Sequence, residues 1–321
     1  MLEENKIKRF LRNLASGILA YLLILSGAVA RARKQSQQPG KILSIFFHNP
    51  PYQLFRKCMR WLVKHGFHFV STDDVTSFLL HQKPLPAGSV WVTFDDGWKD
   101  NLHNVLPVLE EYKIPVTIFI PTGEIERGGF WFCQAIAHKD KLPATYREHP
   151  FESLLAVPNA RRMELTRDLY PATSAEYILN IEELVKLAKH PLVTLGSHTV
   201  NHVVTVHCTE TELDEELGKS KEMLEHWTGT PVTSFAYPNG DHDGREAPCL
   251  RKYGYQLAAT IEEGLIDAQS GPLFLPRNCV LDDGSFAENL CHMLGVWTPF
   301  INGLKRLAGK APQRSTSSTK P

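Results

Sequence analysis

Two pairs of residues in this sequence could act together on a metal ion. His198 and His202 are four positions apart, a spacing that would put two imidazoles on one side of a helical turn and suits two ligands of one metal. Asp95 and Asp96 are adjacent at the expected end of a strand, so their side chains should diverge. With Asp96 as a third ligand the set is an open site that polarises a carbonyl and acidifies water. Each pair alone also fits a simpler interpretation, an Asp-Asp-Gly turn or two solvent-exposed histidines.

Other polar residues also fall where a strand is expected to end. His48 follows the apolar run 42–47, Asn239 follows the run 232–237, and Arg277 closes a short strand. Helical patterns separate the expected strands, and this alternation predicts an α/β fold with a parallel sheet and right-handed crossovers. In a parallel barrel all strand ends meet on one face, where active sites form. The polar residues are therefore expected to converge.

Three short motifs carry a resemblance to a known family. TFDDG at residues 93–97, SHTVNH at 197–202 and FAYPNG at 235–240 resemble the polysaccharide deacetylases, the NodB-homology enzymes of carbohydrate esterase family 4. The resemblance covers about residues 42–294, with 124–180 as a divergent insertion. It implies a distorted (β/α) barrel of the NodB type, preceded here by an N-terminal hydrophobic helix.

The resemblance implies a role for each motif residue that it matches. Asp96, His198 and His202 would be the metal triad, with zinc as the expected divalent ion. Asp95 would be the general base that activates the attacking water. The main-chain N–H of Asn239 would help to stabilise the tetrahedral oxyanion.

The same resemblance suggests residues that contact the sugar. Tyr237 and Pro238 would shape the wall of the sugar site. Trp131 could provide a stacking platform for a sugar ring, although a core position is an equally good interpretation of this residue.

The sequence departs from the family pattern in two places. Many members carry an arginine in the third motif that orients the base, and the aligned residue here is Ala236; Arg277 could supply that charge from another strand end, as in a family branch with a similar Pro-Arg. The general acid is open between two histidines. His292 matches the family's late Leu-x-His but falls in an expected helix, whereas His48 ends the first strand and is preferred.

The expected function is metal-dependent hydrolysis of N-acetyl groups on the amino sugars of a bacterial surface or lipid-linked glycan. One alternative is another C–N hydrolase, such as a cyclic-amide hydrolase, because a fold does not determine the substrate. Another is a glycan-binding relic without activity, which would have lost a ligand or the base, and here all four are present. The glycan is the only partner inferred. Lys+Arg and Asp+Glu both number 35, which argues against nucleic-acid binding.

The N-terminal region points to a membrane. Residues 13–30 contain no charge and would span about 27 Å as a helix, just short of a hydrocarbon core of about 30 Å. This segment is expected to be a membrane anchor, and a cleaved signal peptide and an amphipathic surface helix are the alternatives. Unpaired cysteines favour a domain on the cytoplasmic face of the membrane, whereas the resemblance to the family favours an exported one. The side of the membrane therefore stays open. The chain should divide into an anchor or signal with its linker (1–40), the deacetylase domain (41–300) and a largely disordered tail (301–321).

Overall fold

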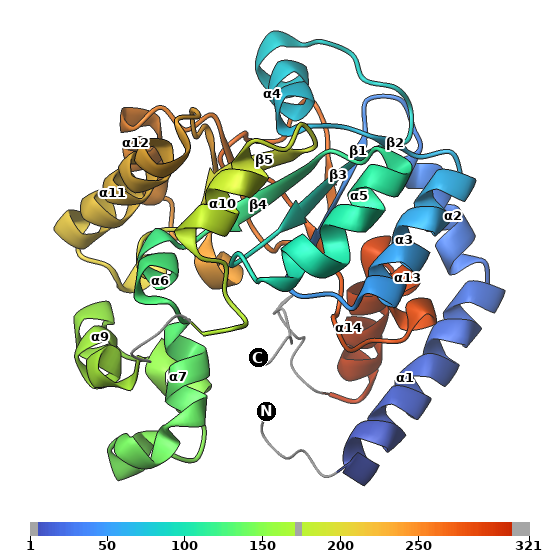
Figure 1. Cartoon of the computed structure of the whole chain (residues 1–321). Helices are drawn as coiled ribbons and strands as arrows, with labels where there is room; N and C mark the ends of the chain where they lie inside the picture. Colours follow the sequence, from blue (N-terminus) through green and yellow to red (C-terminus); the bar gives the residue numbers. More distant parts are fainter. Residues whose placement is uncertain (1–5, 171–174, 310–321) are drawn as a thin grey trace.

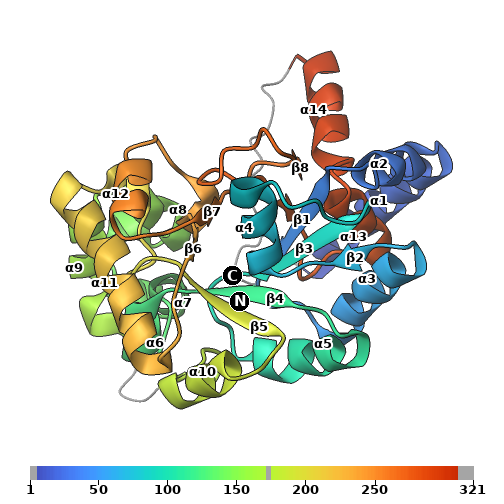
Figure 2. The same cartoon turned by 90° about the horizontal axis from the view of Figure 1, so that it is seen from above.

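The computed structural model describes residues 6–170 and 175–309. A single nine-stranded sheet forms its centre, with the order β7-β6-β5-β4-β3-β1-β8; β2 pairs with β3, and β9 with β1. Helices surround this sheet (Figures 1 and 2). The strands are β1 (Ile42–Phe47), β2 (His68–Phe69), β3 (Ser89–Phe94), β4 (Val116–Ile120), β5 (Val193–Ser197), β6 (Ser234–Ala236), β7 (Leu257–Ala259), β8 (Leu265–Ile266) and β9 (Asn278–Cys279).

The sheet is parallel from β1 through β7, and only β8 runs antiparallel to its neighbour β1. Every residue of β1, β3 and β4 is buried, as expected for parallel strands that are covered on both faces. The segment before β9 joins the two edges of the sheet: Leu275 bridges to Ala259 of β7, and Asn278 then pairs with Ile45 of β1. The sheet is therefore a distorted barrel, as the resemblance implied.

Fourteen α-helices occur in the described part of the chain. The first five are α1 (Lys6–Leu25), α2 (Ala28–Ser36), α3 (Tyr52–Lys64), α4 (Thr72–His81) and α5 (Leu106–Tyr112). The divergent insertion contains α6 (Thr122–Arg127), α7 (Trp131–Ala137), α8 (Pro150–Leu155) and α9 (Asn159–Thr166), which are coloured green in Figure 1. The last five are α10 (Ile181–Ala188), α11 (Glu210–Thr228), α12 (Glu246–Lys252), α13 (Phe286–Met293) and α14 (Trp297–Leu307).

The sequence signals that predicted these elements have clear physical counterparts. The capping box expected at Thr209 and Glu212 is present, since each side chain accepts from the other residue's backbone N–H, and α11 begins there. Pro107 lies in the first turn of α5, where its missing N–H costs no hydrogen bond. All six cysteines are free, and none is exposed.

The two ends of the chain differ from their expected form. The linker expected over 31–40 is helical as far as Ser36, and α14 continues to Leu307 inside the expected disordered tail; residues 310–321 lie outside the described part. Helix α1 packs along α13, and its Ala20 and Leu23 belong to the main hydrophobic core. No single helix in the described ranges is long and apolar enough to cross a membrane, and the stretch from Arg12 meets that test only together with α2, as a pair bent by 68°.

Candidate active site

The Asp95–Asp96 pair lies directly after β3, where the chain turns sharply. Asp96 and Gly97 both have left-handed backbones, with φ of 75° and 76°. At Gly97 an added Cβ would lie 2.9 Å from Ile120, so only glycine fits there. The turn sends the two carboxylates in different directions, and both are buried, with 3% and 4% exposure.

The two histidines are presented by a loop after β5. The expected helical turn is absent: Thr199 and His202 have positive φ angles of 65° and 46°, and the loop still brings the imidazole centroids to 4.9 Å. Positive φ is costly for residues with a Cβ and persists only where the surroundings hold it.

Two neighbouring helices hold this loop. The Glu216 carboxylate on α11 accepts hydrogen bonds from the backbone N–H groups of Val200 (2.8 Å) and Asn201 (2.9 Å). At the start of α6, the N–H groups of Thr122 and Gly123 donate to the carbonyls of Thr199 and Val200.

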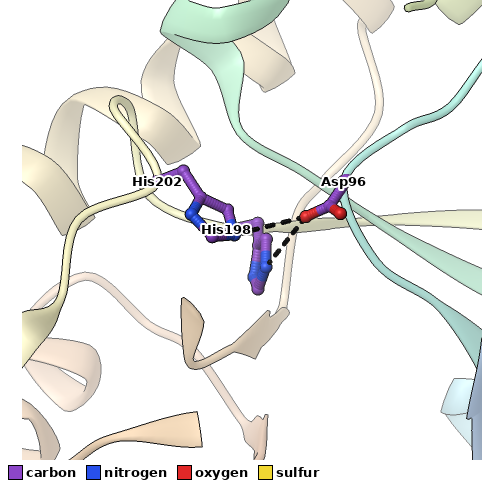
Figure 3. Close-up of side chains that lie close together, drawn as sticks. All are labelled: Asp96, His198 and His202. Carbon is purple, nitrogen blue, oxygen red and sulfur yellow. Dashed lines mark ion pairs between the residues drawn. The ribbon is translucent and has the colours of Figure 1, made fainter. Parts of the chain in front are cut away.

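Asp96, His198 and His202 form a group that fits a metal ion (Figure 3). One ligand atom from each lies within 4.8 Å of the others, and Asp96 Oδ1 is 3.6 Å from His198 Nε2 and 3.3 Å from His202 Nε2. Asp96 Oδ1 is buried and has no hydrogen-bond partner, which a metal ion would satisfy. In the part of the chain that the structure describes, this is the one group of three such ligands found.

Neighbouring groups orient these ligands as a metal site requires. His198 Nδ1 donates to the carbonyl of Ala236 (2.8 Å), so the lone pair of Nε2 faces Asp96. Burial lowers the pKa of His198 to about 4, which keeps the imidazole neutral and able to ligate at neutral pH. Trp98 Nε1 donates to Asp96 Oδ2 (3.0 Å) and leaves Oδ1 free. Two nitrogens and one carboxylate are a ligand set typical of a catalytic zinc ion.

Asp95 is paired with Arg277, which comes from the loop that enters β9. The guanidinium makes a two-pronged contact, Nη1 to Oδ1 at 2.7 Å and Nη2 to Oδ2 at 2.9 Å. Burial is the largest influence on Asp95 and opposes its ionisation, but the charge and hydrogen bonds of Arg277, together with His198 and His48, outweigh it and keep the pKa of the carboxyl below its usual value. Arg277 also donates to Thr93 Oγ1 and the Thr260 carbonyl and lies over the Phe46 ring. The fully buried guanidinium of Arg277 therefore neutralises the buried Asp95 carboxylate. It supplies the positive charge that Ala236 cannot provide from the third motif.

The two candidate acids occupy different environments. His48 follows β1, and its charge acts on both Asp95 and Asp96. His292 lies within α13 against Trp297, and burial alone lowers its pKa to about 4. Among the described residues, His48 acts electrostatically on both carboxylates and His292 does not, so His48 is the better placed of the two candidates.

The third motif contributes backbone more than side chains. Tyr237 is fully buried, its hydroxyl donates to the Leu273 carbonyl at 2.9 Å, and its ring stacks on Phe274. Pro238 is buried as well. Both side chains are buried, and the expectation that they shape the wall of the sugar site stays a prediction. Asn239 follows them in a left-handed turn with φ of 57° and is half-buried.

Trp131 is a core residue and not a stacking platform. Only 2% of it is exposed. One contact is a stacked Phe151 ring and another is the Arg162 guanidinium, 4.6 Å from the ring centre. Its indole N–H points to the His202 carbonyl (3.4 Å). The sugar-stacking expectation is wrong because these neighbours leave the ring no room for a ligand, and the insertion supports the metal-ligand loop instead.

Three residues around the site were missed by the sequence analysis. Trp98 directly follows the TFDDG motif, a position that could have signalled its contact with Asp96. Glu216 interrupts the apolar face of α11 between Leu213 and Leu217, and a carboxylate on a buried face needs partners. Asp282 is half-buried beside His48 and accepts from the Asn49 N–H at 3.1 Å; no sequence pattern indicated it.

Comparisons with known proteins agree with this geometry. The family model described as "Polysaccharide deacetylase" matches residues 82–258, which is more than half of the chain. A poly-beta-1,6-N-acetyl-D-glucosamine N-deacetylase of Staphylococcus aureus is 23% identical over 248 residues, covering 77% of this chain and 71% of that protein.

Solved structures share the fold. The Streptococcus pyogenes deacetylase PplD, in complex with acetate, has a TM-score of 0.60 and 20% identity, covering 80% of this chain and 99% of that one. IcaB from Ammonifex degensii has a TM-score of 0.59 and 19% identity, covering 80% and 98%. With the ordered motifs, the buried ligand triad and the barrel in place, the chain belongs to the polysaccharide deacetylase family, hydrolases of carbohydrate esterase family 4 that cleave the C–N bond of N-acetylated sugars.

Proposed function

We propose that this enzyme removes N-acetyl groups from a bacterial polymer of N-acetylglucosamine that is presented at a membrane. The observation that carries the proposal is the Arg277–Asp95 pair, whose ionised carboxylate lies next to an oriented metal-ligand triad. A relic that only binds glycan would have no need to keep a buried base ionised. The Staphylococcus aureus relative named for poly-beta-1,6-N-acetyl-D-glucosamine supports the substrate class.

Each residue of the site has a proposed part in the hydrolysis. Asp95 accepts the proton of the attacking water, and Arg277 keeps it ionised for that purpose. The N–H of Asn239 donates to the oxyanion that forms at the acetyl carbon. His48 then gives a proton to the sugar nitrogen, so that the C–N bond breaks and acetate and a free amine leave.

The cofactor is proposed to be one zinc ion, held by Asp96, His198 and His202. When bound there, such an ion polarises the amide carbonyl and acidifies water. Two imidazoles and a carboxylate, all three buried, support zinc over magnesium or calcium, which prefer sets made of oxygen atoms.

Association with a membrane through residues 13–30 is also part of the proposal, because this run is uncharged and has basic residues on both sides. The glycan would then be lipid-linked or part of a bacterial surface. Fractionation of cells tests the association, and protease treatment of intact spheroplasts tests on which side the domain lies.

The activity is tested by acetate release from N-acetylglucosamine oligomers by the full-length protein. We expect release that is abolished by chelation, restored by zinc and absent in Asp95→Asn. Asp100→Asn, an acidic-to-amide change at a half-buried position nearby in the sequence, is the matched control and should retain activity. Hydrolysis of a cyclic amide, with no acetate release from the oligomers, would replace the proposal with the other C–N hydrolase. Tight oligomer binding without acetate release would indicate a relic.

A further inference from the structure

Helix α1 has two apolar faces, and the protein covers only one of them. Ala20 and Leu23 on the inner face are 0% and 6% exposed and pack towards α13. The sulfhydryl of Cys291 lies 3.8 Å from the Ala20 carbonyl. Arg12 is paired with Asp283 at 2.8 Å. These contacts fix α1 lengthwise on the domain, at the outer edge of the molecule beside α13 (Figure 1).

The outer face of α1 is a row of large apolar side chains. Their spacing of four, three, one and three residues keeps them on one side of a helix, and they are between 51% and 82% exposed. The row, called here the α1 stripe, consists of Leu14, Ile18, Tyr21, Leu22 and Leu25. Apolar side chains gathered in this way mark an interaction surface, whereas scattered ones need no explanation.

Basic residues outnumber acidic ones around the α1 stripe. Residues 5–40 contain seven lysines and arginines and no aspartate or glutamate, and the acidic Asp283 nearby is paired with Arg12. The whole chain is neutral, so the excess of acidic residues lies elsewhere. Arg31 and Lys34 on α2 and Arg306 on α14 are exposed, and α14 also presents Leu304 and Leu307 to solvent. An apolar row flanked by exposed basic residues is complementary to anionic lipid headgroups.

We propose that the α1 stripe docks in the plane of an anionic lipid bilayer, while the inner face of α1 stays on α13. The helix then lies along the membrane surface and does not cross it, which agrees with the bend of 68° between α1 and α2. The inference specifies the membrane association proposed above and does not depend on the deacetylase activity.

Binding is tested by flotation of the full-length protein with phosphatidylcholine vesicles, with and without phosphatidylglycerol. We expect binding that requires phosphatidylglycerol and weakens with salt. Ile18→Glu should reduce the bound fraction about tenfold or more, because it removes one buried aliphatic side chain and adds a repelled charge. Leu80→Glu changes a leucine of α4 that is 42% exposed and is the matched control, which should bind as the parent does. Acetate release, measured on the same samples without lipid, reports on the active site separately.

The depth of the α1 side chains in the bilayer distinguishes a helix on the membrane surface from one that spans the membrane. Leu14→Trp, Ile18→Trp and Leu25→Trp are placed singly in the α1 stripe and quenched with lipids brominated at different acyl positions. A helix in the plane gives the same shallow depth at all three positions. A spanning helix would give depths that differ by about 16 Å between positions 14 and 25, and this result would overturn the proposal. Vesicle binding unaffected by Ile18→Glu would overturn it as well, as would a dimer in lipid-free solution that Ile18→Glu dissociates.

Discussion

Replacing Arg277 tests whether the enzyme depends on a base kept ionised inside the protein. In Arg277→Ala, the Asp95 carboxylate loses both contacts, at 2.7 and 2.9 Å, and stays buried. Burial then acts without the opposing charge of Arg277, so the pKa of Asp95 rises. We expect the acid limb of the pH–rate profile to move upward, and the metal content to stay unchanged because Arg277 contacts none of the three ligands.

The size of the effect follows from the geometry. A cation in direct contact lowers the pKa of a carboxyl by about 1–3 units, so the acid limb should move by about that amount, with a tenfold loss of rate per pH unit below the new pKa. Removal of one partner from a buried ion pair costs about 3–5 kcal/mol of stability. Because the pKa of Asp95 is lowered in the folded state, this penalty is full at neutral pH and shrinks as the pH falls below about 4.

The assay compares acetate release between the parent, Arg277→Ala and Arg277→Lys across the pH range, with metal analysis and urea unfolding of each protein. Arg277→Lys keeps a charge without the planar fork and should give an intermediate shift, and it remains informative if the alanine variant fails to fold. A profile that overlays the parent's, with equal metal content, would refute the reasoning and leave Arg277 a purely structural role.

Further substitutions test the other assignments. Asp95→Asn should keep the metal and lose turnover, since an amide cannot accept a proton from water, whereas alanine at any of the three metal ligands should lower metal content; normal turnover by Asp95→Asn would remove it as the base. His48→Ala should cost about 10²–10⁴ in rate as a general acid does, and His292→Ala should leave the rate unchanged; the opposite result would reverse the assignment. Because burial lowers the pKa of His292 to about 4, the folded protein loses stability as the pH falls from 6.5 towards 4, and urea titrations should show His292→Leu reducing this loss. Glu216→Gln should weaken zinc affinity in a competition assay with KM unchanged, compared with Glu215→Gln on the exposed side of α11, and equal affinities would assign Glu216 to stability alone.

The strand ends and metal ligands could be predicted because they depend on local patterns. Buried runs such as 89–94 are mostly apolar strands, and Asp95 and Asp96 follow this one. The contact between Arg277 and Asp95 could be predicted from the sequence as well. The third motif has Ala236 where many family members have an arginine, so the positive charge had to come from another residue. The exposure of side chains could not be predicted from the sequence. Trp131 is as compatible with a sugar site as with a core, and only the packing of the insertion determines that it is buried.

The loop that carries His198 and His202 was predicted with the wrong conformation for a related reason. Spacing of four residues indicates a helical turn where local preference determines the backbone conformation. In this loop, contacts with distant groups determine it. The Glu216 carboxylate and the N–H groups at the start of α6 hold Thr199 and His202 at positive φ. Neither contact is visible from the residues 198–202 alone, because α11 and α6 are separate elements.

The ion pair between Arg277 and Asp95 joins residues 182 positions apart, and this separation bears on how the enzyme is synthesised. Chains emerge from the ribosome at about 5–20 residues per second, so Asp95 appears roughly ten seconds or more before its partner can exist. During that interval the sheet lacks β9 and the segment that joins its edges, and the carboxylate has no reason to be both buried and ionised. A chain that ends before Arg277 lacks β9 and the counter-charge of Asp95 at the same time, so we expect acetate release only from chains that extend past this residue.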